Sequence, residues 1–220
     1  MRQDPYRFVA RWYDKIFGPM NRGLRLLGLR MFRPREGMSI LDVGCGTGAH
    51  LELYQRYRCH MYGIDPSPAM IQVARERLGD RAEFHLGDAS DMPYENRSFD
   101  LVICMLALHE MNPPTRCAVI GEMKRVLKQA GRILLIDFHP APVRPFKSWL
   151  ARLGVLFSEI AAGREHFRNY RHFMSTQGLP ALITEHALVV EKQKVVGGGA
   201  LALFLLRTFH PCEGSARACW

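Results

Sequence analysis

The chain has 220 residues and is 48% hydrophobic, which suits one α/β domain with an extension and argues against two equal domains. No apolar run is long enough to span a bilayer, and the first residues lack a signal-peptide pattern. We therefore expect a cytoplasmic protein. The formal net charge of +9 arises largely from an excess of basic residues near the N-terminus.

Residues 1–37 are expected to form lid helices beside the main domain. Arginines and lysines alternate there with aromatic and aliphatic residues. We predict a helix whose apolar face packs on the domain while its arginines stay in solvent. The alternative is peripheral contact with an anionic membrane surface. No RNA- or DNA-binding module accompanies the charge, so nucleic acid is not expected as a partner.

Apolar runs alternate with amphipathic stretches from residue 38 to about 137, which predicts parallel strands with helices on both faces. The expected strands are 38–43, 59–64, 82–86, 100–105 and 132–138. The expected helices are 47–57, 66–78 and 114–128. Two further strands, 187–196 and 200–207, flank Gly197-Gly198-Gly199 and should form an antiparallel hairpin. The sequence thus predicts an α/β fold, a doubly wound, seven-stranded, mostly parallel sheet with an antiparallel last strand, over residues 38–209.

The first expected strand ends in a glycine-rich turn, Gly44-Cys45-Gly46-Thr47-Gly48. Glycine adopts positive φ without strain and lets a ligand approach the backbone closely. Asp65 ends the next strand about 20 residues later, where a carboxylate can accept hydrogen bonds from both hydroxyls of a ribose. Together these features predict a nucleoside cofactor. By itself, Gly44-x-Gly46-x-x-Ala49 also fits the pattern of an NAD site.

Four motifs, in this order and spacing, resemble those of the class I S-adenosylmethionine-dependent methyltransferases. They are residues 41–48, 63–67, 87–89 and 98–102. The resemblance implies a Rossmann-like methyltransferase fold and S-adenosyl-L-methionine as the cofactor. Gly87-Asp88-Ala89 and the closing hairpin disfavour an NAD(P)-dependent oxidoreductase. That enzyme class and a non-catalytic cofactor-binding protein are the two alternatives.

The resemblance also implies which residues bind the cofactor. They are Tyr13, Asp42, Gly44, Cys45, Gly46, Gly48, Asp65, Pro66, Met70, Asp88, Ala89 and Met105. Asp42 would receive the ammonium group, Asp65 the ribose hydroxyls and Asp88 the adenine amino group. The N–H of Ala89 would donate to a ring nitrogen, and the two methionines of the set would enclose the adenine. Asp65 and Asp88 have an alternative interpretation as caps of helices or turns.

Residues 9–14, 131–140 and the closing hairpin are similar to the ubiquinone/menaquinone-biosynthesis C-methyltransferase group, the methyltransferase type 11 group. This likeness implies a small, hydrophobic, quinone-like acceptor. The quinone enzymes usually carry an Arg-Asn pair after strand four, whereas this chain has residues 108–112, Leu-His-Glu-Met-Asn. The acceptor therefore stays open among quinone-like molecules, lipid amines and thiols.

His109 follows a central strand and is the predicted general base, because imidazole titrates near neutrality. His139, after strand five, is a second candidate. Residues 139–180 are expected to cover the acceptor site, with the apolar side chains Phe146, Trp149, Leu150, Leu153, Leu156 and Phe157 lining it. In the alternative interpretation, this cover only packs on the sheet. Residues 210–220 are expected to be a loose tail.

The six cysteines show no CxxC pair and no regular spacing with histidine, so no metal site is predicted. Cys45 and Cys104 lie in apolar strand contexts. They are predicted to be buried thiols of a protein in a reducing compartment.

Overall fold

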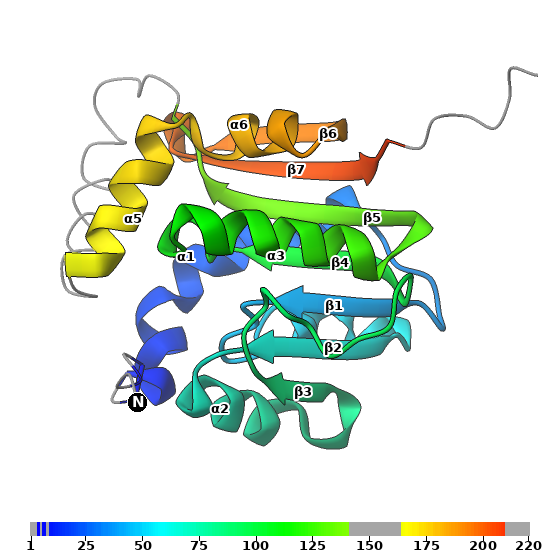
Figure 1. Ribbon diagram of the computed structural model, residues 1–220. Helices are drawn as coiled ribbons and strands as arrows, with labels where there is room; N and C mark the ends of the chain where they lie inside the picture. Colours follow the sequence, from blue (N-terminus) through cyan, green and yellow to red (C-terminus); the bar gives the residue numbers. More distant parts are fainter. Residues whose placement is uncertain (1–3, 5, 8, 141–163, 210–220) are drawn as a thin grey trace, which may run out of the picture.

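A seven-stranded sheet in the order β3-β2-β1-β4-β5-β7-β6 forms the centre of the fold (Figure 1). The fold is that of a computed structural model, which describes residues 4, 6–7, 9–140 and 164–209. The strands are β1 Ser39–Val43, β2 His60–Asp65, β3 Glu83–Leu86, β4 Phe99–Met105, β5 Leu127–Phe138, β6 Leu188–Val196 and β7 Leu201–Thr208. The helices are α1 Ala10–Met31, α2 Pro68–Leu78, α3 Pro113–Val126, α5 Arg164–Ser175 and α6 Gly178–Glu185. Short 3-10 helices are η1 Leu51–Tyr57, η2 Gly79–Arg81, η3 Leu108–Glu110 and η4 Gly197–Gly199.

The predicted fold class is confirmed. Strands β1 to β5 pair in parallel, and β7 runs antiparallel to both β5 and β6. Strand β6 and β7 form the expected hairpin around the three glycines of η4. Strands β1 to β3 are added toward one edge of the sheet, and the chain then crosses back so that β4 pairs on the other side of β1. The order of the strands therefore reverses beside β1, and ligands bind at such a topological switch point in open α/β sheets.

Two predicted elements differ from the structure. The expected helix 47–57 is only the 3-10 helix η1, because Gly48 has φ of +72° and interrupts any helix before Leu51. The expected strand 132–138 begins earlier, at Leu127, because this residue has an extended backbone and pairs with Phe99. Helix α3 ends one residue before it.

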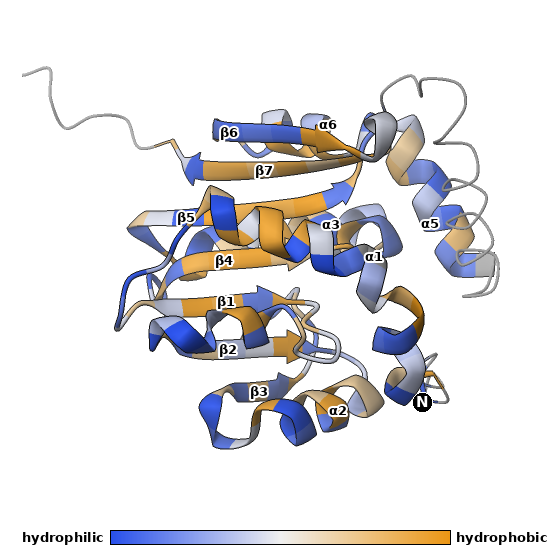
Figure 2. Ribbon diagram, turned by 180° about the vertical axis from the view of Figure 1, so that it is seen from behind, coloured by the Kyte–Doolittle hydropathy of each residue, from blue (hydrophilic) through white to orange (hydrophobic). Residues whose placement is uncertain are grey.

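Helices cover both faces of the sheet, as the apolar strands require. Helices α3 and α6 lie on the face toward the viewer in Figure 1, and α1 and η1 lie on the face toward the viewer in Figure 2. Alternate residues of β4 pack on opposite faces of the sheet. Val102 and Cys104 pack on the face that α3 covers, whereas Leu101 and Ile103 pack on the face that α1 covers. The predicted burial of Cys45 and Cys104 is confirmed.

The predicted lid segment contains one long helix among its described residues. The second half of α1 packs closely on the sheet, where a Cβ at Gly28 would lie 2.9 Å from Leu134 Cδ2. The first half extends past the carboxyl ends of the parallel strands, on the same side as α5 (Figure 1). Within the described residues, none of the helices has the length and apolar character needed to cross a membrane.

Burial on both faces makes β4 the strand most sensitive to truncation. We predict that Val102→Ala, at 0% exposure, lowers the free energy of unfolding by roughly 2 kcal/mol through lost apolar burial and a cavity. Val190→Ala, at 43% exposure in β6, is the matched control and should change it by less than about 0.5 kcal/mol. Urea unfolding of both variants measures the difference. An equal loss of unfolding free energy in the two variants would contradict the difference in burial between Val102 and Val190.

Candidate functional site

A cavity of about 830 Å³ opens at the carboxyl ends of β1, β2 and β4. The N-terminal residues and the first half of α1 form one wall, and α5 contributes another. Its volume is within the range of small-molecule sites, and polar groups from several distant segments converge on it. These properties make it the candidate functional site.

Most of the predicted cofactor-binding residues line this cavity. They are Tyr13, Asp42, Gly44, Cys45, Gly46, Asp65, Pro66, Met70, Asp88 and Met105. Gly48, Ala89 and His109 lie outside the lining. At Gly48 a Cβ would lie 3.2 Å from Ala74 Cβ, so this glycine allows close packing beneath the turn. Ala89 is 7% exposed and belongs to the core.

Asp65 joins the glycine turn to the start of α2. Its Oδ2 accepts from Gly46 N–H at 2.9 Å, and its Oδ1 accepts from Ser67 N–H at 2.9 Å. Gly46 has φ of +51°, the left-handed conformation that the glycine pattern predicts. Burial raises the pKa of Asp65, although the two amide hydrogen bonds act in the opposite direction. Each oxygen keeps a lone pair directed at other donors.

Asp88 lines the cavity and also caps a turn, because its Oδ1 accepts from Ser90 N–H at 2.8 Å. The predicted cofactor-binding role of Asp88 and its alternative role as a turn cap are thus compatible in the structure.

Buried polar atoms without hydrogen-bond partners cluster beside β1. They are Asp42 Oδ1, Asn21 Oδ1 and both ring nitrogens of His50, and all three residues line the cavity with Arg25. Burial raises the pKa of Asp42 to about 7, against the lowering effect of Arg25. Burial, aided by Arg25, lowers the pKa of His50 to about 3, so this imidazole is neutral at pH 7. Unsatisfied buried groups are costly, which indicates that a ligand completes them.

Asp14, next to Tyr13, fixes α1 against the glycine turn. Its Oδ2 accepts from Thr47 Oγ1 at 2.6 Å, and Arg25 and Arg77 form ion pairs with the same carboxylate. The side chain of Tyr13 is thereby held at the cavity, where its ring packs 4.9 Å from that of Phe17.

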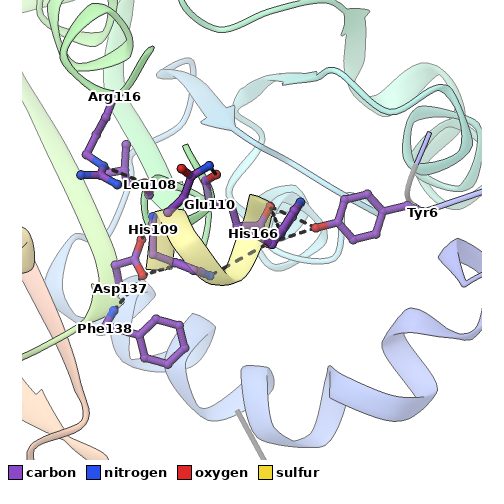
Figure 3. Close-up of polar contacts among 9 residues, drawn as sticks. Tyr6, Leu108, His109, Glu110, Arg116, Asp137, Phe138 and His166 are labelled. Carbon is purple, nitrogen blue, oxygen red and sulfur yellow. Dashed lines mark hydrogen bonds and ion pairs between the residues drawn. The ribbon is translucent and has the colours of Figure 1, made fainter. Parts of the chain in front are cut away.

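A cluster around Glu110 also lines the cavity (Figure 3). Tyr6 Oη donates to the Glu110 carboxylate, with both oxygens at 3.0 Å, and His166 Nδ1 lies 3.9 Å from its Oε2. Asn169 Nδ2 donates to the Glu110 carbonyl at 2.8 Å. Tyr6, Glu110, His166 and Asn169 come from the N-terminus, η3 and α5, so only the folded chain brings them together.

His109 lies behind Glu110 and is 3% exposed. Its Nδ1 is 2.7 Å from Asp137 Oδ1, and its Nε2 is 4.0 Å from Glu110 Oε1 (Figure 3). Phe138 packs edge-on against the imidazole at 4.7 Å. Direct contact of His109 with an acceptor, as the sequence predicts, is not supported by this placement. His139 is also outside the lining, and it stacks on Phe204.

Buried Arg116 supports the turn that carries both residues. Its Nε donates to the Leu108 carbonyl at 2.9 Å, and its Nη2 donates to the Met111 carbonyl at 2.7 Å. Leu106, just before this turn, lines the cavity with φ of +53°, a strained conformation for a leucine. The β4–α3 connection is therefore tightly held.

Several cavity residues were missed by sequence reasoning. They include Asp4, Tyr6, Asn21, Arg25, Thr47, His50, Glu110, Glu165 and Asn169. His166 is a polar residue that the sequence offers to the acceptor-site cover, and it does line the cavity. One sequence signal was available for Asn21, a polar residue on the apolar side of an amphipathic helix. The predicted apolar lining residues between 146 and 157, and the tail 210–220, lie outside the described residues. The described part of the predicted cover, α5, does contribute to the cavity.

One group of metal-ligand type occurs in the described part of the chain, away from the cavity lining. Cys117, Glu185 and His186 bring one potential ligand atom each within 4.8 Å of one another. All three side chains are half-buried or exposed, and Lys124 donates to the His186 carbonyl at 2.8 Å.

Comparisons with known proteins show the family and the fold. A family described as a methyltransferase domain matches residues 40–131. A demethylmenaquinone methyltransferase of Thermotoga maritima is 31% identical over 166 residues, which cover 70% of this chain and 68% of that protein. The Desulfitobacterium hafniense protein of the same description is 28% identical over 223 residues, covering 91% and 87%. An S-adenosylmethionine-dependent methyltransferase structure from Aquifex aeolicus has the same fold, with a TM-score of 0.62, 19% identity and coverage of 90% and 98%.

The fold, the glycine turn and these matches define the class of protein, an enzyme that uses S-adenosyl-L-methionine. The chain belongs to the class I S-adenosylmethionine-dependent methyltransferases and is related to the menaquinone group. The two alternatives, an NAD(P)-dependent oxidoreductase and a non-catalytic protein, are set aside.

The raised pKa of Asp42 predicts a pH-dependent stability without cofactor. The folded chain keeps a proton on this carboxyl up to about pH 7, whereas an unfolded aspartate releases it near pH 4. The contribution of Asp42 to the free energy of unfolding should therefore fall as pH rises from about 4 to about 7 and stay constant above. Asp42→Asn removes this contribution, so the variant should gain stability relative to the native chain between pH 5 and pH 8.

Urea unfolding at pH 5, 6 and 8 measures this gain. Asp80→Asn, an exposed aspartate of η2, is the control and should show no such trend. A pH-independent difference for Asp42→Asn would contradict the buried, proton-bearing carboxyl.

Proposed function

We propose that this methyltransferase acts on a small apolar acceptor that carries an ionisable ring hydroxyl, of the quinol kind. The observation that carries the proposal is one cavity that is lined both by the glycine turn with its aspartates and by the Tyr6–Glu110–His166 cluster. S-adenosyl-L-methionine supplies an electrophilic methyl group. The chain must supply orientation, exclusion of water and a place for the acceptor proton.

The cofactor residues act as follows in this proposal. Asp65 accepts from the ribose hydroxyls, and Asp88 accepts from the adenine amino group, with Met70 and Met105 beside the ring. Ionised Asp42 holds the ammonium group. Asn21 Oδ1, a second acceptor, faces the same ammonium group, whereas the single N–H of neutral His50 and the guanidinium of Arg25 donate to the carboxylate of the same amino-acid end. This assignment gives Asp42 Oδ1, Asn21 Oδ1 and one ring nitrogen of His50 a complementary group, which supports it.

Glu110, rather than His109, is the group that takes the acceptor proton. Glu110 lines the cavity, and the hydroxyl of Tyr6 orients its carboxylate, with His166 Nδ1 3.9 Å from Oε2. Ionisation of a ring hydroxyl increases the electron density on that oxygen and on the adjacent ring carbon, and either can then attack the methyl group. His109, bonded to Asp137, positions Glu110 from behind.

The relatives support a quinone-like acceptor, because their description names demethylmenaquinone. The chain lacks the Arg-Asn pair that the quinone enzymes usually carry after β4. Product analysis must therefore show whether the methyl group is on carbon or on oxygen. A lipid amine is the second candidate, because three carboxylates, those of Asp4, Glu110 and Glu165, line the cavity and would attract a cation.

The acceptor is tested with methyl-labelled S-adenosylmethionine and two probes, a chemically reduced short-chain demethylmenaquinone and a short-chain phosphatidylethanolamine. We expect label in the quinol product and none in the lipid amine. Mass spectrometry of the product then locates the methyl group on carbon or oxygen. Label in the amine alone would replace the first candidate by the second, and label in neither would contradict both.

Glu110→Gln should lower kcat by about 10² or more, because the amide cannot accept the proton. Calorimetry with S-adenosylhomocysteine should show cofactor affinity within about twofold of native, since this proposal assigns Glu110 to the acceptor and not to the cofactor. Glu83→Gln, exposed on β3, is the matched control and should leave kcat unchanged.

His109→Gln separates the two histidine roles. For a positioning residue, kcat should fall less than in Glu110→Gln and should keep the same dependence on pH. An unchanged kcat in Glu110→Gln, with a loss only in His109→Gln, would restore His109 as the base.

A further inference from the structure

The first turns of α1 expose large apolar side chains on one face. Val9, Trp12 and Ile16 are 42%, 57% and 60% exposed. Their spacing of three and four residues places them on one side of a helix. We call this set the α1 apolar face. In Figure 2 apolar and polar residues alternate along this part of α1, which extends beyond the edge of the sheet.

Cationic side chains flank the α1 apolar face. Arg11, Lys15 and Arg22 are exposed on the same helix, and Lys15 Nζ lies 4.4 Å from the centre of the Trp12 ring. Arg11 is partly balanced by exposed Glu76, at 3.6 Å.

The acidic side chain of the helix points elsewhere. Asp14 is turned inward to Thr47, Arg25 and Arg77, so its charge is neutralised at the glycine turn. The outward surface of α1 therefore combines apolar side chains with a net positive charge.

The same helix forms a wall of the cavity. Tyr13 lines the cavity, while its neighbour Trp12 and nearby Ile16 are exposed, so the α1 apolar face lies directly beside the wall of the cavity. A surface that binds α1 from outside is thus next to the site where an acceptor must enter.

We propose that the α1 apolar face and its flanking cations dock the enzyme on an anionic lipid bilayer, from which the apolar acceptor reaches the cavity. The acceptor part of this inference rests on the proposed function. A bilayer is the occupant that the charges favour, because aromatic and aliphatic side chains enter the headgroup region while arginine and lysine pair with anionic lipids. A bilayer also requires no shape complementarity from a small, convex face.

Co-sedimentation of the full chain with vesicles tests the docking. We expect binding to phosphatidylcholine vesicles with 50% phosphatidylglycerol, roughly tenfold weaker binding to pure phosphatidylcholine, and loss at high salt, as expected for charge-assisted docking. Trp12→Ser with Ile16→Ser, and separately Arg11→Gln with Lys15→Gln, should each lower binding to the anionic vesicles by about fivefold or more.

The controls alter similar side chains elsewhere. Val190→Ser on exposed β6, and Arg56→Gln with Lys194→Gln, should bind like the native chain. Because the charge variants keep the apolar side chains of α1, they test the docking even if the serine variants unfold. No binding of the native chain to anionic vesicles, or equal binding by all variants, would overturn the proposal, and capture by a protein partner only would do the same.

Turnover separates this inference from the proposed function. The α1 variants should methylate a short-chain, water-soluble quinol at the native rate without vesicles, and they should be slowed only when a long-chain quinol is embedded in anionic vesicles. Vesicle binding without any quinol product would contradict the acceptor and leave the docking in place. If the native chain methylates the quinol but does not bind the vesicles, the docking alone is contradicted.

Discussion

The site depends on one buried carboxylate. Asp65 accepts one backbone hydrogen bond from Gly46 and another from Ser67, so it ties the glycine turn after β1 to the helix start after β2. Both turns lie at the switch point of the sheet, and Asp65 lines the cavity with lone pairs that these two bonds do not use. Burial of this charge is tolerated because two amides solvate it. The same bonds hold the glycine turn that lines the cavity.

Helix α1 imposes a second constraint on the site, because its last, middle and first turns each have a different role. Its last turns pack on the sheet at Gly28, and its middle supplies Asn21 and Arg25 to the buried polar cluster. Its first turns, fixed by Asp14, bear Tyr13 on the cavity side and apolar residues outside. The same helix therefore forms a wall of the cavity and carries the exposed α1 apolar face.

Two parts of the cavity lining differ in chemistry. The part beside β1 has unpartnered polar atoms around Asp42, which suit a zwitterionic group. The part at η3 has a carboxylate already oriented by Tyr6 and supported by the His109–Asp137 pair. Orientation before the substrate arrives is an effective use of such groups, because little reorganisation is then needed during reaction.

The sequence by itself determined the sheet, the glycine turn, the position of Asp65 and the class of cofactor. Each of these is encoded in contiguous apolar runs or short motifs, whose meaning depends on local backbone geometry. Tertiary structure decided that Gly48 packs against α2 and that His109 is enclosed by Phe138 and Asp137. It also decided that Glu110 faces the cavity beside Tyr6, a pair 104 residues apart in the chain. Such long-range pairs follow from how helices pack on the sheet, and no local pattern records that packing.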